Sequence, residues 1–280
     1  MPQPRSSSNV ATDAQVSEIH SRITFHVKIS IITACLNSAD TLEDTIRSVL
    51  SQTHKDIEHI IVDGKSRDAT LDIVTKYKSR IAKCISERDD GVYSAMNKGL
   101  KLATGDIVAT LNSDDVYADE TIVARMVEFI QGNGLDAAYG DLVYIRPNNS
   151  EHVTRFWKAG EYKRGAFSYG WVIPHPTFFC RKQVFEKYGY FNHDFQIAAD
   201  FELMLRFVEK HQINVGYLPR VIVKMRTGGK ANVLRGTIRG NREIIRSFRL
   251  NNLRLSPCFF ALKPLLKTSQ LFKRPRLSPR

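Results

Sequence analysis

The chain has 280 residues, 42% hydrophobic and 25% charged, which is the composition of an ordinary globular protein rather than of a disordered or membrane-embedded one. No apolar run reaches the roughly 18 residues that a transmembrane helix needs. The net charge of +12 is concentrated at one end, because Arg220 to Arg280 holds 16 of the 41 basic residues and one of the 29 acidic ones. We therefore expect the C-terminal end to meet an anionic partner, and membrane head groups and nucleic acid both qualify.

The N-terminal segment and the cysteines indicate the compartment. Residues 1–25 are polar and lack the apolar stretch of a secretory signal, so we expect them to form a disordered tail. The four cysteines show no CxxC spacing, which argues against a disulfide framework and against a zinc site. Both observations favour a cytoplasmic protein.

Apolar runs and helical patterns alternate from Val27 onward. Strands are expected at 27–34, 57–62, 81–86 and 106–111, and helices at 40–51, 71–77, 91–102 and 119–131. This alternation predicts an α/β fold with a doubly wound, mostly parallel sheet and helices on both faces.

The regular alternation of strands and helices ends after about residue 137. Short strands are expected at 142–145, 152–157, 215–218 and 221–225, with one helix at 198–211. We interpret residues 26–230 as one domain whose second half adds substrate-specific parts, followed by a basic helical region over residues 231–280.

Acidic clusters follow three successive predicted strands: Asp63, the segment 87–90, and the pair Asp114 and Asp115. Because the carboxyl ends of parallel strands meet at one edge, these clusters should converge where open α/β sheets bind ligands. Adjacent carboxylates repel each other, so a divalent cation such as Mg²⁺ or Mn²⁺ is the natural counter-charge. The alternative for the last pair is a solvated loop opening a helix, with Asp115 or Asp119 as cap. Neither GxGxxG nor a P-loop occurs, which removes the main support for dinucleotide-binding and kinase functions.

Four segments carry a family resemblance. They are VKISIITACLNSADTLEDTIRSVLSQTHKDIEHIIVDGKSRDAT, SERDDGVYSAMNKGLKLATGDIVATLNSDD, HPTFFCRK and AADFELMLR. Together they resemble bacterial family 2 glycosyltransferases with the GT-A fold, from about Lys28 to Arg226. The resemblance implies an inverting, metal-dependent hexosyltransferase. It would move a sugar from a nucleotide donor, a UDP-sugar in the first instance, to a hydroxyl of a lipid-linked saccharide in O-antigen or other surface polysaccharide assembly.

The same resemblance implies roles for individual residues. Asp200 falls on the catalytic base, which takes a proton from the acceptor hydroxyl. Asp114 and Asp115 fall on the ligands for Mg²⁺ or Mn²⁺, and Asn112 stands at the first position of the family's DxD motif, where an acid is usual. The residues implied in donor or acceptor binding are Thr33, Ala34, Asn37, Asp63, Asp90, Asn97, Lys98, Asn112, His175 and Arg226.

Each role has a structural alternative. Asp63 can be a turn residue before a glycine, and Asp200 can be the N-cap of a helix with a buried face. His175 can be a packed histidine between two prolines, while Asn97 and Lys98 can lie in an ordinary exposed helix start. Arg226 and Lys230, proposed to reach the diphosphate, can equally belong to a mobile surface turn, and Trp171 can be buried rather than stacked on a sugar.

Departures from the family pattern keep other functions open. Asn112 and Ala199 replace acids, which is compatible with a catalytically inactive nucleotide-sugar-binding or membrane scaffold protein. A nucleotidyltransferase shares the acidic metal chemistry but gives the helix of Asp200 no obvious task.

The basic C-terminal region reads as an amphipathic helix over residues 240–255. Its apolar residues fall near one face and its arginines elsewhere, which is typical of a helix at a membrane interface. We therefore expect a peripheral protein at the inner face of the plasma membrane; the alternative is that the apolar face packs against the domain. No nucleic-acid-binding motif accompanies the charge, so nucleic acid is not expected as a partner.

Overall fold

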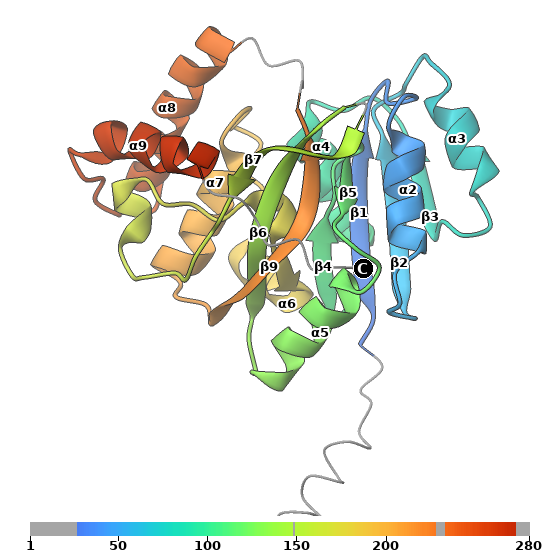
Figure 1. Ribbon diagram of the computed structural model, residues 1–280, viewed down its shortest axis with the longest axis horizontal. Coiled ribbons are helices and arrows are strands. Elements are labelled where there is room, and N and C mark those ends of the chain that lie inside the picture. Colours follow the sequence, from blue (N-terminus) through green and yellow to red (C-terminus); the bar gives the residue numbers. More distant parts are fainter. Residues whose placement is uncertain (1–26, 148, 228–232, 273–280) are drawn as a thin grey trace, which may run out of the picture.

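The computed structural model describes residues 27–147, 149–227 and 233–272. The tail expected at 1–25 and the glycine turn with Lys230 lie outside these residues. Within the described part, one mixed sheet of nine strands carries helices on both of its faces (Figure 1). The predicted α/β architecture is therefore confirmed.

The first half of the sheet is parallel, as the alternating pattern predicted. Strand β1 pairs in parallel with β2 and β4, and β2 pairs in parallel with β3. Every residue of β1 is buried, which explains its continuous apolar and β-branched sequence. The ends of three strands lie in register, Cys35 beside Asp63 and Asp63 beside Ser86, so their loops leave from the same edge. The strands are β1 Ile29–Cys35, β2 Ile57–Asp63, β3 Lys83–Ser86 and β4 Ile107–Thr110.

The second half of the sheet is mixed. The strand order is β3-β2-β1-β4-β8-β6-β9-β5, and β7 pairs with β6 off this path. Antiparallel pairs join β4 to β8, β8 to β6, β6 to β7 and β9 to β5. The two strands expected at 215–218 and 221–225 form one strand. Its register shifts between them, because Pro219 has no N–H to donate to the neighbouring strand. The strands are β5 Asp115–Tyr117, β6 Ala137–Arg146, β7 Asn149–Trp157, β8 Phe179–Arg181 and β9 Val215–Arg226.

The helices form two layers that enclose the sheet. Neighbouring side chains of β1 point to opposite faces, so Ile32 packs in the core that includes Leu100 of α4, whereas Ile31 packs with Met126 of α5. Helices α2 and α3 cover the same face as α5, and α6 and α7 the same face as α4. The helices are α2 Leu42–Leu50, α3 Thr70–Lys76, α4 Val92–Leu102, α5 Ile122–Gly132, α6 Lys182–Tyr188 and α7 Ala199–Met204; α7 continues as a π-helical segment, η3 Leu205–Lys210.

The basic C-terminal region shares the core of the domain. Helix α8, Val233–Leu250, buries Ile244 and Phe248 in the same cluster as α7, and the ring centroid of Phe248 lies 5.9 Å from that of Phe201. Helix α9, Phe259–Phe272, packs on β7 and on the short 3₁₀ helix η1, Ala166–Tyr169 (Figure 1). The apolar face expected to meet a membrane is thus packed against protein. No helix in the described ranges is long and apolar enough to span a bilayer.

Candidate active site

The loops after β1, β2 and β4 interlock at the carboxyl edge of the sheet. The backbone N–H of Asn37 donates to Ser66 Oγ at 2.8 Å, and the N–H of Arg67 donates to Asn37 Oδ1 at 2.9 Å. The hydroxyl oxygens of Ser38 and Ser113 lie 2.9 Å apart. Asn37 has a φ of 49°, a left-handed conformation that asparagine tolerates. The three loops therefore form one connected wall, and Asn37 is its central link.

Asp63 supports this wall from inside. Its side chain is fully buried and accepts hydrogen bonds from the Ser66 N–H at 3.1 Å, from the Ser66 hydroxyl and from Ser86 Oγ at 2.6 Å. These donors occupy most of the acceptor capacity of the carboxylate. The structure thus displays the turn role of Asp63, and its contact with a nucleotide base stays a prediction. The side chains of Thr33 and Ala34 are also buried, with the Thr33 hydroxyl 3.1 Å from His59 Nε2.

The second acidic cluster, in the segment 87–90, is ion-paired with a lysine. Lys98 Nζ lies 2.7 Å from Asp89 Oδ1 and 2.5 Å from Glu87 Oε1. Hydrogen bonds to Asp89 and then to Glu87 raise the pKa of Lys98, so the ammonium stays charged. Asp90 is exposed beside this ion-paired group.

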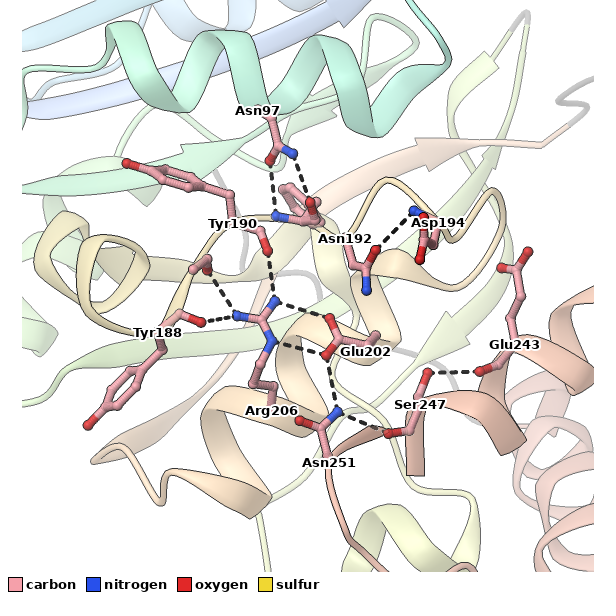
Figure 2. Close-up of polar contacts among 12 residues, drawn as sticks. Asn97, Tyr188, Tyr190, Asn192, Asp194, Glu202, Arg206, Glu243, Ser247 and Asn251 are labelled. Carbon is pink, nitrogen blue, oxygen red and sulfur yellow. Dashed lines mark hydrogen bonds and ion pairs between the residues drawn. The ribbon is translucent and has the colours of Figure 1, made fainter. Parts of the chain in front are cut away.

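Asn97 joins α4 to the loop after α6. Its Nδ2 donates to the carbonyl oxygen of Phe191 at 2.8 Å, and its Oδ1 accepts from the N–H of the same residue at 3.0 Å (Figure 2). The side chain is 3% exposed and both of its polar ends are engaged. Asn97 therefore fixes the segment that leads to Asp200, and its expected part in closing the nucleotide pocket stays a prediction.

The Asn-Ser-Asp-Asp motif places two carboxylates side by side at the end of β4. Asp115 is fully buried; its Oδ2 accepts from Asn112 Nδ2 at 2.9 Å, and its Oδ1 has no hydrogen-bond partner. Burial, and next the charge of Asp114, raises the pKa of Asp115 to about 8. Burial also raises the pKa of Asp114, against the opposing charge of Arg226. Burial thus disfavours the charged form of both carboxyls, and a further positive charge would favour it.

This motif fits a magnesium or manganese ion. The unpartnered Asp115 oxygen and the more accessible Asp114 carboxylate offer two hard oxygen ligands. No group of three or more His, Cys, Asp or Glu residues that could hold a metal occurs in the described part of the chain. Such a sparse donor set matches Mg²⁺-type sites, which are completed by substrate phosphates and water.

Arg226 at the end of β9 locks the acidic loop in place. Its Nη1 donates to the carbonyl oxygen of Asp114 at 3.0 Å, and its Nη2 lies 2.5 Å from Asp44 Oδ2. The side chain is 11% exposed. Arg226 is therefore a fixed link between β9, α2 and the metal motif, and its reach to a diphosphate stays a prediction.

Asp200 is held at the start of α7. Its Oδ1 accepts from the Phe201 N–H at 2.8 Å and lies 3.2 Å from the hydroxyl of Tyr93, which also lies 2.9 Å from the carbonyl oxygen of Ile197. Burial, and then the Asp200 charge, raises the pKa of Tyr93, so this phenol remains a hydrogen-bond donor. Asp200 is half-buried, which leaves its carboxylate capacity for a further donor.

His175 packs against the end of β4 and is close enough to Asp200 to feel its charge. Its Nε2 is 3.2 Å from Thr110 Oγ1 at the end of β4, and its ring stands edge-on to Phe191 with centroids 5.5 Å apart. Burial lowers the pKa of His175, opposed by the charge of Asp200. It borders a cavity of about 10 Å³ lined mainly by apolar residues, room for about one water molecule. His175 is thus a packed side chain that neighbours the catalytic candidate.

Three residues that matter here were missed by sequence reasoning. Arg206 donates to both oxygens of Glu202 at 3.0 Å and to the carbonyl oxygens of residues 188–190, a network beneath α7 (Figure 2). Glu202 and Arg206 stand four residues apart, a spacing that was available in the sequence. The third is Tyr93. Its partner, Asp200, lies 107 residues away in the sequence, so no local pattern predicts the contact.

Trp171 is packed rather than open for stacking on a sugar. Its Nε1 donates to the carbonyl oxygen of Ala159 at 2.7 Å, and its ring contacts Tyr139 and Phe167 edge-on.

Comparisons with known proteins identify the family of this chain. The sequence matches the family "Glycosyl transferase family 2" over residues 30–191, more than half of the chain. It is 30% identical to a PGL/p-HBAD biosynthesis glycosyltransferase of Mycobacterium tuberculosis over 210 residues, 73% of this chain and 79% of that protein. It is 31% identical to the Escherichia coli UDP-Glc:alpha-D-GlcNAc-diphosphoundecaprenol beta-1,3-glucosyltransferase WfaP over 186 residues, 65% of this chain and 70% of that protein.

Solved structures show the same fold at lower identity. Staphylococcus aureus TarS 1–349 in complex with UDP-GlcNAc superposes with a TM-score of 0.64 at 18% identity, covering 87% of this chain and 71% of that one. The mannosyltransferase PcManGT of Pyrobaculum calidifontis, in complex with GDP-Man and Mn²⁺, gives a TM-score of 0.61 at 20% identity, with 88% and 70% covered. Because the family model matches more than half of its sequence, the chain belongs to glycosyl transferase family 2.

Proposed function

We propose that this glycosyltransferase is an inverting, metal-dependent hexosyltransferase that uses a UDP-sugar and a lipid-linked saccharide acceptor in O-antigen or other surface polysaccharide assembly. The observation that carries the proposal is the presence of two carboxylate sites in one molecule. Asp114 and Asp115 lie at the end of β4, and the half-buried Asp200 lies at the start of α7. The E. coli relative, named for UDP-Glc and a diphosphoundecaprenol-linked sugar, supports the choice of donor and acceptor.

The two carboxylate sites have different chemical roles. Asp200 accepts the proton of the acceptor hydroxyl as that oxygen attacks the anomeric carbon, and Tyr93 fixes the carboxylate for this step. Asp114 and Asp115 would hold Mg²⁺ or Mn²⁺, and the bound cation would offset the charge that develops on the diphosphate leaving group. Asn112 and Arg226 orient the two ligand residues through their hydrogen bonds.

The variant Asp200→Asn tests the assignment of the base. The amide keeps the size of the side chain but cannot take a proton, so we expect turnover to fall by about 100-fold or more while donor binding is retained. The matched variant Asp114→Asn should weaken donor binding in Mn²⁺ instead. Near-normal turnover by Asp200→Asn would refute the assignment. Release of a nucleoside diphosphate, rather than pyrophosphate, separates sugar transfer from nucleotidyl transfer.

A thermal-shift screen identifies the donor. UDP-, GDP- and dTDP-sugars are compared in Mn²⁺, because a ligand that binds the native state stabilises it by mass action. The proposal predicts that UDP-sugars give the largest shift. A larger shift with GDP- or dTDP-sugars would overturn the choice of nucleotide, and no shift with any donor would support a scaffold role.

We also propose that the protein binds the inner face of the plasma membrane through an arginine stripe on α8. The stripe consists of four exposed residues spaced three or four apart, Arg239, Arg242, Arg246 and Arg249. Arg242 and Arg249 have no acidic partner among the described residues. Since the apolar face of α8 is packed in the core, attraction to anionic head groups is electrostatic, about 1 kcal/mol per arginine.

Flotation with vesicles containing anionic lipid tests this interaction. The variant Arg242→Glu/Arg249→Glu should lose binding, whereas Lys78→Glu/Lys101→Glu, which makes the same change in net charge at exposed sites on other helices or loops, should keep it. An equal loss of vesicle binding in both variants would show that binding depends on net charge and not on the stripe. Failure of the unmodified chain to float would refute the proposal. Truncation before α8 is unsuitable, because it removes Ile244 and Phe248 from the core.

A further inference from the structure

The turn that precedes Asp200 is held by one carboxylate from a distant part of the chain. Glu243 of α8 accepts the backbone N–H of Ile197 at 2.9 Å and of Ala198 at 2.8 Å on Oε2, and that of Gln196 at 3.1 Å on Oε1. Three consecutive amides thus converge on a single side chain. One carboxylate thus holds this short irregular segment at three backbone positions. Without it, each amide would need another acceptor or a water molecule.

Glu243 is itself firmly placed. Its side chain is 8% exposed, and Arg239 Nε lies 3.2 Å from Oε1. Burial raises the pKa of Glu243, but hydrogen bonds from Ile197, Ala198 and Gln196 outweigh burial and lower the pKa overall, so the group is charged at neutral pH. The core residues flanking it in α8 and the hydrogen bond from Asn251 to Glu202 fix the helix on α7 (Figure 2).

Tyr93 links the held turn to Asp200. The hydroxyl of Tyr93 lies 2.9 Å from the carbonyl oxygen of Ile197 and 3.2 Å from Asp200 Oδ1, so one side chain contacts both the turn and the carboxylate. If Glu243 is lost, three amides lose their acceptor and the turn can reorient to reach water. The carboxylate of Asp200 would then shift relative to the acceptor hydroxyl.

We propose that Glu243 is a positioning residue for Asp200, which makes α8 part of the catalytic apparatus in addition to its part in the fold. This inference rests on the proposed role of Asp200 as base. A displacement of about 1 Å at a reacting group can cost on the order of 100-fold in rate. The signature of positioning is a loss of turnover number without a loss of donor affinity.

The test compares Glu243→Ala and Glu243→Gln with Ile244→Val, a buried neighbour in α8 whose side chain has no polar group to bond the turn. We expect the alanine variant to lose about tenfold or more in kcat with the donor KM unchanged, and the glutamine variant, which keeps one acceptor oxygen, to fall between it and the native protein. Ile244→Val should lower the unfolding midpoint and leave kcat unchanged. If the alanine variant does not fold, the glutamine variant carries the comparison alone. A kcat near the native value in the glutamine variant would then overturn the proposal.

A double-mutant cycle separates positioning from a merely structural role. If Glu243 acts through Asp200, Glu243→Ala should not further reduce the residual turnover of Asp200→Asn. Hydrogen exchange of the amides of residues 196–198 should accelerate in the single alanine variant. Native kcat in that variant, or the same fold-loss in both backgrounds, would overturn the inference. Near-normal turnover by Asp200→Asn would instead remove the base assignment itself, so the two failures are distinguishable.

Discussion

Replacing Arg206 by methionine tests how strongly the ion pair beneath α7 stabilises the protein. The guanidinium is 13% exposed and Glu202 is 4% exposed, so both charges are largely withdrawn from water. Arg206 also donates to the carbonyl oxygens of Gly189 at 3.0 Å and Tyr190 at 2.7 Å. Methionine fills a similar volume with no charge, and it leaves Glu202 with Asn251 as its remaining side-chain donor.

The expected loss follows from the asymmetry of buried ion pairs. Removing one partner leaves an uncompensated buried charge, which costs about 3–5 kcal/mol in free energy of unfolding. Glu202→Gln should cost less, about 1–3 kcal/mol, because Arg206 keeps its carbonyl acceptors. The double variant should lose less than the sum of the two, with a coupling of about 0.5–3 kcal/mol.

Urea unfolding at pH 7, followed by circular dichroism, measures these values. The matched control is Arg47→Met, which removes an arginine that is 61% exposed from its surface pair with Glu43 and should cost at most about 1 kcal/mol. A loss below about 1 kcal/mol for Arg206→Met would show that the network is not coupled to global stability. Simple additivity in the double variant would show that the two charges do not stabilise each other.

Two further predictions concern carboxylates. Burial raises the pKa of Glu58, but hydrogen bonds, first from Ser30 and Thr104, outweigh it and hold the pKa at about 2 instead of the ordinary 4.5. This stabilisation, about 3 kcal/mol, is fully present above pH 4.5 and is lost as the pH falls towards 2. In Glu58→Gln, the free energy of unfolding measured in urea should therefore fall less steeply between pH 4.5 and 2 than in the native protein. An unchanged slope would contradict the assignment. Asn112→Asp adds a third carboxylate beside Asp115, so it should lower the melting temperature without metal and enlarge the shift produced by Mn²⁺; equal shifts in both proteins would argue against a cation at the motif.

The parallel half of the sheet was predictable from sequence because its strands are buried on both faces. Such strands read as continuous apolar runs, as in β1, and the alternating helices fix their direction. Strands β5 and β8 were missed because each has three residues and owes its existence to antiparallel partners far along the chain. Periodicity cannot reveal a pairing that only the folded chain creates.

The candidate site was predictable in its residue types but not in its partners. Asp63, Asn97 and Arg226 lie at or near the expected edge, yet each bonds mainly to protein groups, and no local pattern specifies such contacts. Glu243 did leave a signal, because it is the one acid between Arg220 and Arg280. A lone acid in a basic segment has few reasons to be there unless it bonds to something specific.

The charges that remain at the sheet edge decide how a donor can bind. Lys98 and Arg226 are ion-paired with carboxylates, whereas Asp90 is exposed and Asp115 retains a free oxygen. A nucleoside diphosphate brings further negative charge, so it should require a divalent cation to bind at neutral pH. Chelation by EDTA should weaken UDP-sugar binding, measured by calorimetry, at least about tenfold, and Mn²⁺ should restore it, while uridine, which lacks phosphates, should bind equally well in both conditions. Unchanged UDP-sugar affinity in EDTA would mean that protein cations neutralise the diphosphate, and the assignment of Asp114 as metal ligand would fall with that result.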